Sequence, residues 1–281
     1  MLRQRIITAL LLAPIAIICI FLLPIKGLAV LLSAIVLIAS YEWSGLVSRS
    51  TFTRIGITVT LALVWLASFA VFSWQSAAQN SGLIALFFIA VIFWLVALLL
   101  VLRYPDSAQY WSTNPLLKWF AGLLALIPFG WSMLVLRNTN TQHSWVGALW
   151  VLYVMALVWA ADTGAYFAGR RFGRTKLAEK VSPNKTIEGL AGGLVAAIVI
   201  CLLVLAIVRP DINGWVFVGT SVLTALVSVL GDLFESMLKR EAKIKDSGSL
   251  LPGHGGILDR IDSLTAALPV FTFCYLLWVA L

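Results

Sequence analysis

The stretch Leu83–Leu102, LIALFFIAVIFWLVALLLVL, carries no charged side chain and determines which class of fold the chain can adopt. A helix needs about 20 apolar residues to cross the hydrocarbon core of a bilayer. The whole chain of 281 residues shares this character, with 61% apolar residues, 11% charged residues and a mean hydropathy of +1.00. Soluble domains carry about 25% charged residues. We therefore expect an integral membrane protein and exclude a soluble enzyme, a secreted disulfide scaffold and a nucleic-acid-binding domain.

Apolar runs of similar length lie on both sides of this stretch. Together they predict an all-α fold, a polytopic integral membrane protein with about nine transmembrane helices. The expected spans are Ile6–Leu23, Leu28–Trp43, Ile55–Trp74, Leu83–Leu102, Leu116–Leu136, Val146–Ala161, Gly189–Val208, Trp215–Leu230 and Leu264–Leu281.

The basic residues predict the orientation of these spans. With a cytoplasmic N-terminus, all of the 20 lysines and arginines except Lys26, Arg137 and Arg209 fall on the cytoplasmic side. Positive charge gathers on that side of membrane proteins. The net charge of +8 therefore reflects membrane orientation, and no nucleic-acid partner is expected. We expect a multi-pass membrane protein, with the lipid bilayer as its solvent.

The acidic residues divide the chain into two regions. Only Glu42 and Asp106, of 12 acidic residues, precede residue 162. Residues 1–145 are therefore expected to form a transmembrane scaffold. Residues 146–281 are expected to form a catalytic or ligand-binding transmembrane region with two charged cytoplasmic loops, 162–188 and 231–263, so that the active or binding site faces the cytoplasm.

The second of these loops begins with polar residues at helical spacing. Asp232, Glu235, Ser236, Lys239 and Lys243 would form one stripe on a continuing helix. On its own, this stripe is equally typical of an amphipathic helix end whose acids pair with neighbouring bases. Asp246 follows, and Asp259 and Asp262 then share one face at the start of the last span. Carboxylates without a His or Cys cluster suit Mg²⁺. The expected metal ligands are Asp232, Asp246, Asp259 and Asp262.

Two further segments offer contacts for phosphate. The turn Pro252–Gly256 has backbone amides that can approach an anion, and His254 within it is equally suited to a structural hydrogen bond. In the first loop, Asp162 ends an apolar run, and Ser182 with Pro183 predicts a helix start beside Lys185. The bases between residues 170 and 180 are also explained by contact with anionic lipid headgroups.

These motifs resemble those of the phosphatidate cytidylyltransferases, also called CDP-diacylglycerol synthases. The resemblance rests on SxLKR at 236–240, KDSG at 245–248 and HGGIxDRID at 254–262, and extends to SPxKTxEG at 182–189 and ADTGAY at 161–166. It implies Mg²⁺-dependent transfer of a cytidylyl group from CTP to phosphatidic acid, giving CDP-diacylglycerol and pyrophosphate for phospholipid biosynthesis. It also implies a homodimer and a location in a bacterial-type inner membrane. A second, monovalent or divalent, cation would fit the same site.

The site residues follow from the motifs and this resemblance. The expected catalytic residues are Asp246, Asp259, Asp262, Lys239, Arg240 and Lys245. The expected substrate-binding residues are Ser182, Lys185, Thr186, His254, Gly255, Gly256, Arg260, Asp162 and Glu235.

Other functions use similar residues. A CTP-dependent lipid kinase would move the γ-phosphoryl group to an alcohol instead. An alcohol phosphotransferase acting on a CDP-lipid would need a DGxxAR motif, which the sequence lacks. A transporter or a non-catalytic scaffold would form no lipid product from a nucleotide.

Overall fold

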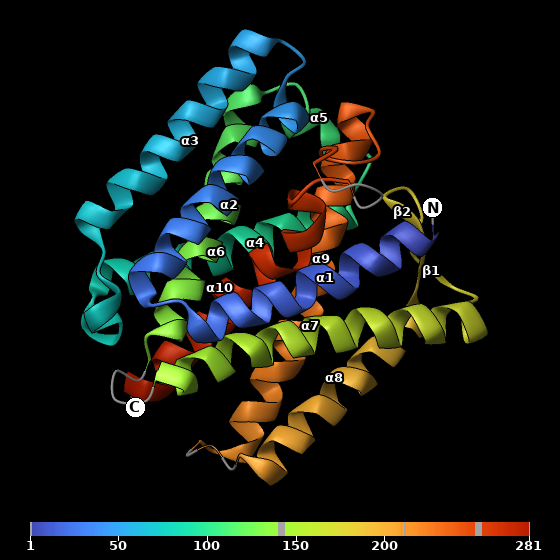
Figure 1. Cartoon of the computed structure of the whole chain (residues 1–281). Helices are drawn as coiled ribbons and strands as arrows, with labels where there is room; N and C mark the ends of the chain where they lie inside the picture. The colour runs from blue at the N-terminus through green and yellow to red at the C-terminus, as the bar shows by residue number, and fades with distance from the viewer. Residues whose placement is uncertain (1, 140–143, 209, 211, 251–254, 281) are drawn as a thin grey trace.

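The computed structural model describes residues 2–139, 144–208, 210, 212–250 and 255–280. Most of them lie in long helices (Figure 1). The N-terminal region contains α1 (Leu2–Leu22), α2 (Ile25–Val47), α3 (Thr51–Val71), the 3₁₀ helix η1 (Trp74–Gln79), α4 (Ser81–Leu102), the short α5 (Ala108–Trp111) and α6 (Pro115–Arg137). The C-terminal region contains α7 (Ser144–Phe172), β1 (Lys176–Ala178), β2 (Ser182–Thr186), α8 (Ile187–Ile207), α9 (Gly214–Ala242) and α10 (Leu258–Ala280).

Eight helices in the described part of the chain are long and apolar enough to cross a membrane: α2, α3, α4, α6, α7, α8, α9 and α10. The predicted all-α, polytopic membrane fold is thereby confirmed. The expected first span falls on α1, a helix of 21 residues. The count of nine spans and the cytoplasmic N-terminus stay predictions.

Short polar residues set several helix starts. Asn80, Asn114 and Asn213 each accept a hydrogen bond from a backbone amide in the first turn of the helix that follows. The helix α9 ends at Ala242. The next residue, Lys243, is its C-cap and has a left-handed φ of 55°, which breaks the helical hydrogen-bond pattern. The helix ends therefore follow from local sequence as much as from packing.

The helix α6 lies at the centre of the packing. Every residue from Ala125 to Arg137 is buried, as expected for a helix that is surrounded by others. By contrast, α3, α4 and α8 keep large apolar side chains exposed, such as Leu63, Leu95 and Val195. Because such surfaces are unfavourable in water, these helices are suited to face lipid.

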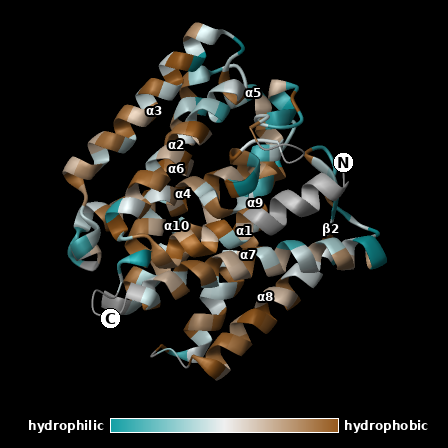
Figure 2. Ribbon diagram, in the orientation of Figure 1, coloured by the Kyte–Doolittle hydropathy of each residue, from teal (hydrophilic) through white to brown (hydrophobic). Residues whose placement is uncertain are grey.

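The most extensive helix contact joins α7 to α8 and depends on small residues. A methyl group added at Gly164 of α7 would lie 2.6 Å from the carbonyl oxygen of Gly192 of α8. Such close backbone approach is typical of membrane helix pairs. Figure 2 shows hydrophilic residues around β2, the C-terminal end of α7 and the C-terminal end of α9, at one end of the bundle.

Two local predictions in this region are wrong. Ser182 does not cap a helix, because residues 182–186 form β2, which pairs antiparallel with β1. The N-cap of α8 is Thr186, whose hydroxyl accepts a hydrogen bond from the Gly189 amide at 3.0 Å. Lys185 therefore lies on a strand, and α7 runs to Phe172, well into the segment expected to be a loop.

Candidate active site

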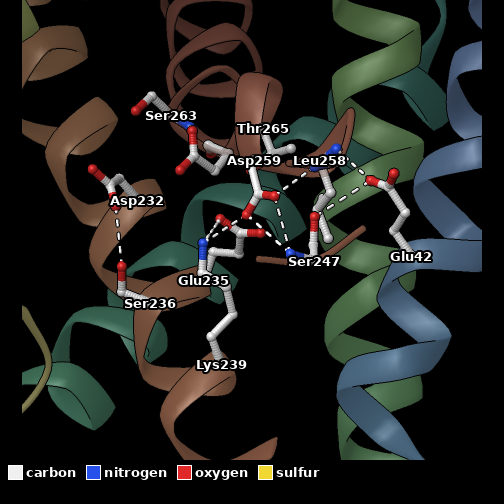
Figure 3. Close-up of polar contacts among 12 residues, drawn as sticks. Glu42, Asp232, Glu235, Ser236, Lys239, Ser247, Leu258, Asp259, Ser263 and Thr265 are labelled. Atoms are coloured by element: carbon white, nitrogen blue, oxygen red, sulfur yellow. Dashed lines mark hydrogen bonds and ion pairs between the residues drawn. The ribbon is translucent and has the colours of Figure 1, made fainter. Parts of the chain in front are cut away.

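The polar stripe on α9 forms as predicted from Asp232 to Lys239, whereas the predicted last member, Lys243, lies just beyond the helix with a left-handed φ of 55°. Lys239 Nζ lies 2.9 Å from a carboxylate oxygen of Glu235, one turn earlier on the helix. The Ser236 hydroxyl donates to Asp232 at 3.2 Å. Glu235 is 2% exposed, and burial of a carboxylate is costly unless an opposite charge or a hydrogen bond compensates for it. Lys239 supplies that compensation (Figure 3).

Asp259, in the first turn of α10, is held on several sides. Its carboxylate accepts hydrogen bonds from Lys239 Nζ at 2.8 Å, the Ser247 amide at 3.0 Å and the Gly256 amide at 2.7 Å. Gly255 makes the turn possible because its φ is 80°, and an added methyl group there would lie 2.5 Å from the Asp259 carboxylate. The two glycines thus wrap the backbone around Asp259, and the predicted contact of Gly255 and Gly256 with phosphate stays a prediction.

Asp262 lies one turn further along α10, next to Glu235. One of its oxygens accepts a hydrogen bond from the following amide, of Ser263, at 2.7 Å. The Oε1 atom of Glu235 is buried and has no hydrogen-bond partner among the described residues. Two carboxyl groups therefore lie close together, and one oxygen of Glu235 has no donor within the described ranges.

The β1–β2 hairpin brings the other predicted segment to α9. Lys185 Nζ lies 2.7 Å from Asp232, and Asp162 of α7 lies near both. The three residues line a cavity of about 560 Å³, together with Tyr166, Arg170, Ser182, Asn184 and Thr186. The hairpin is fixed to α9 by Arg240, whose Nε donates to the Val181 carbonyl at 3.0 Å. Segments far apart in the sequence therefore meet at the C-terminal half of α9.

The four expected metal ligands do not form one cluster. Asp232 pairs with Lys185, Asp259 is held by Lys239 and two amides, and Asp246 is exposed beside Gly255. Within the described ranges, no three His, Cys, Asp or Glu side chains are grouped so as to hold a metal ion by themselves. Lys245 and Arg260 are exposed near this region, and His254 lies outside the described residues.

Sequence reasoning missed Glu42 of α2. This residue is 4% exposed, and its carboxylate accepts hydrogen bonds from the backbone amides of Ile257 and Leu258 at 3.0 and 2.7 Å (Figure 3). A signal was present, because a lone acidic residue in an apolar run is costly and indicates a specific role. Residues 1–145 therefore contribute to the site and are more than a scaffold.

A second contact joins the two regions at the end of α9. The Tyr104 hydroxyl donates to Glu241 at 2.8 Å, and the buried Lys118 of α6 lies near the same carboxylate. Burial and the hydrogen bond to Glu241 raise the pKa of Tyr104 to about 12. The N-terminal region thus holds the last turn of α9 as well as the first turn of α10.

Long apolar helices with acidic and basic groups gathered at one end define the class: a polytopic membrane protein with a charged site. A family model described as the cytidylyltransferase family matches residues 3–278. A phosphatidate cytidylyltransferase of Haemophilus influenzae is 42% identical, over 98% of this chain and 99% of the relative. One of Pseudomonas aeruginosa is 43% identical, over 100% and 98%.

The chain therefore belongs to the cytidylyltransferase family, and it is a nucleotidyltransferase. A further relative, a phosphatidate cytidylyltransferase of Staphylococcus aureus, is 47% identical over 44% of this chain and 48% of its own length. The resemblance inferred from the motifs is confirmed.

Proposed function

We propose that the protein transfers a cytidylyl group from CTP to phosphatidic acid, forming CDP-diacylglycerol and pyrophosphate. The observation that supports this most directly is the meeting of two cavities. The polar cavity beside Lys185 and Asp232 shares Leu177, Leu190 and Val229 with an apolar cavity of about 540 Å³. The apolar cavity lies between α4, α9 and the hairpin. A phosphorylated lipid has one part suited to each cavity.

In the proposed reaction, an oxygen of the lipid phosphate attacks the α-phosphorus of CTP. The bond from this phosphorus to the bridging oxygen of the β-phosphate breaks, and pyrophosphate leaves with the electron pair. The attacking phosphate is already ionised near neutral pH, so no strong general base is required. The barrier comes from bringing two anions together, and electrostatic stabilisation and positioning lower it. Lys185 and Lys239 are suited to neutralise phosphate charge.

The carboxylates fit Mg²⁺, which takes one or two of them and completes its shell with water and phosphate oxygens. The buried Oε1 of Glu235 has no hydrogen-bond partner in the described part of the chain, and Asp262 lies beside it. We assign Asp262 and Asp232 to the metal, and Asp259 to holding Lys239, because its oxygens already accept three groups. Bound Mg²⁺ would neutralise charge on the triphosphate and on the departing pyrophosphate.

The proposal extends to location and assembly. The bias of basic residues and the bacterial relatives support an inner-membrane protein whose site faces the cytoplasm. Homodimer formation is proposed from the family resemblance.

The test uses purified protein in vesicles containing phosphatidic acid, incubated in parallel with α-labelled and γ-labelled CTP. We expect label in the lipid from the α position only, and none without Mg²⁺. Lipid labelled only from the γ position would identify a lipid kinase instead. An absence of labelled lipid from either substrate, with protein that is folded and correctly inserted, would refute the proposal. The Asp232→Asn variant should form little product, whereas Asp106→Asn, with the same loss of charge at an exposed site, should match the wild type.

A further inference from the structure

Glu42 accepts hydrogen bonds from backbone amides at the start of α10 that have no acceptor within the helix. The first amides of any helix have no partner within the helix. At the start of α10, the amides of Ile257 and Leu258 donate to the two carboxylate oxygens of Glu42, at 3.0 and 2.7 Å. The Ser247 hydroxyl donates to the same carboxylate at 3.4 Å. A helix start is usually capped by the residue just before it, whereas this cap lies 216 residues from Leu258.

The loop packs so closely against Glu42 that two of its positions have no room for a side chain. A methyl group added at Gly248 or Gly256 would collide with the Glu42 carboxylate. Contact with Glu42 therefore explains why both positions are glycine, without any bound phosphate. The helix α2 is itself held next to Glu42, because the Trp43 indole donates to the Lys118 carbonyl at 2.9 Å. The carboxylate therefore approaches the loop from a fixed helix.

The residues that Glu42 holds are those that hold Asp259. The Ser247 hydroxyl contacts Glu42, and the Ser247 amide donates to Asp259 at 3.0 Å. Gly256 packs against Glu42 and donates its amide to Asp259 at 2.7 Å. Asp259 in turn bonds Lys239 at 2.8 Å. A continuous chain of contacts thus runs from α2 through the loop to the charged groups of the site.

We infer that Glu42 is a positioning residue for cytidylyl transfer. It fixes the loop and the first turn of α10, so that Asp259 keeps Lys239 in place for the phosphates. This inference rests on the proposed function. The buried carboxylate is favoured there by the hydrogen bonds that it accepts and by the N-terminal end of the helix dipole.

The first test is Glu42→Gln, which keeps the size of the side chain but replaces one acceptor oxygen by a donor facing an amide. Asp106→Asn is the matched control, because it removes the same charge in the same half of the chain at an exposed site. We expect kcat to fall roughly 10- to 100-fold in Glu42→Gln, as for a small misplacement of reacting groups, with the KM for CTP changed less than about threefold. An unchanged kcat, or a loss confined to KM, would overturn the inference.

A second readout does not depend on activity. Hydrogen exchange of peptides covering residues 243–262 should speed up about tenfold or more in Glu42→Gln, while peptides from α3 and α8 keep the wild-type rate. Unchanged exchange in the loop would contradict the positioning role even if activity fell. If the wild type forms no labelled lipid but Glu42→Gln still speeds exchange in the loop, the contact is supported and the proposed function is rejected. Failure of the inference and failure of the proposed function are therefore distinguishable.

Gly248→Ala tests the same contact without changing a charge. In an otherwise unchanged chain, Gly248→Ala should lower kcat at least about tenfold, because the added methyl group displaces Glu42. In a Glu42→Ala background the collision is gone, so the same substitution should have less than about a twofold further effect. Independent effects that multiply in the double variant would show that Gly248 and Glu42 act separately, and would refute the inference.

Discussion

Replacing Lys239 by Met tests whether the charged cluster is held together by a single cation. Lys239 lies 2.9 Å from Glu235 and 2.8 Å from Asp259, and its side chain is 14% exposed. Removing one partner from a buried ion pair costs about 3–5 kcal/mol, because the other charge stays buried without compensation. For a chain of this size, each kcal/mol corresponds to about 2–4 °C in melting temperature. We therefore expect Lys239→Met to melt roughly 6–20 °C below the wild type in detergent.

The two carboxylates should not contribute equally to this loss. Asp259 keeps the hydrogen bonds from the Ser247 and Gly256 amides, whereas Glu235 loses the hydrogen bond from Lys239 and its Oε1 atom has no partner among the described residues. A second substitution, Glu235→Gln, should therefore recover at least half of the lost melting temperature, although activity stays low.

The assay is thermal unfolding of purified protein followed by tryptophan fluorescence, with Lys26→Met as a control at an exposed lysine. A Lys239→Met protein that melts within about 2 °C of the wild type would show that water screens the cluster. A double variant less stable than the single one would show that Glu235 is stabilised by groups other than Lys239. Either result would refute the reasoning.

Three further predictions concern the edges of the site. Lys185→Met, which removes the cation paired with Asp232, should lower kcat/KM for CTP at least about tenfold with a near-normal melting temperature, measured by product formation and unfolding. Gly255→Ala should destabilise the protein by roughly 1–3 kcal/mol, because its φ of 80° is unfavourable for alanine, and thermal unfolding measures this. Tyr104 has a pKa raised to about 12, so the unfolded chain releases this proton at lower pH than the folded protein does, and stability is lost as pH rises from about 10 to 12. Tyr104→Phe should weaken that alkaline loss in melting curves recorded against pH.

The sequence predicts the fold class well because membrane helices depend on local composition. Runs such as Leu83–Leu102 are apolar enough to identify spans one at a time, and α4 (Ser81–Leu102) begins within two residues of the expected position. The hairpin could not be recognised in the same way. Its strands are three and five residues long, and the pattern of Ser182 followed by Pro183 is also typical of a helix start. The pairing of this segment with β1 and the hydrogen bond from Arg240 to Val181 distinguish the strand from a helix start, and neither follows from the local pattern.

In the candidate site, too, the contacts within one helix could be predicted from the sequence, whereas the contacts between elements could not. The spacing of Asp232, Glu235 and Lys239 predicts their shared face, because neighbours on one helix follow a fixed geometry. Which acid bonds which base does not follow from spacing. Lys185 bonds Asp232, and Lys239 bridges to Asp259 on another helix, because the tertiary packing brings these particular pairs together.

Glu42 shows why a low density of motifs is a poor guide to what a region contributes. The first 161 residues contain two acidic side chains, and they differ in surroundings: Asp106 is exposed and Glu42 is buried. A carboxylate within a membrane span is retained only if specific donors compensate for its burial. No donor for Glu42 is evident in the sequence around it, since its partners are amides of a loop more than 200 residues away. The unexplained acid is therefore itself evidence of a distant contact, and it indicates that α2 and the start of α10 act as one unit.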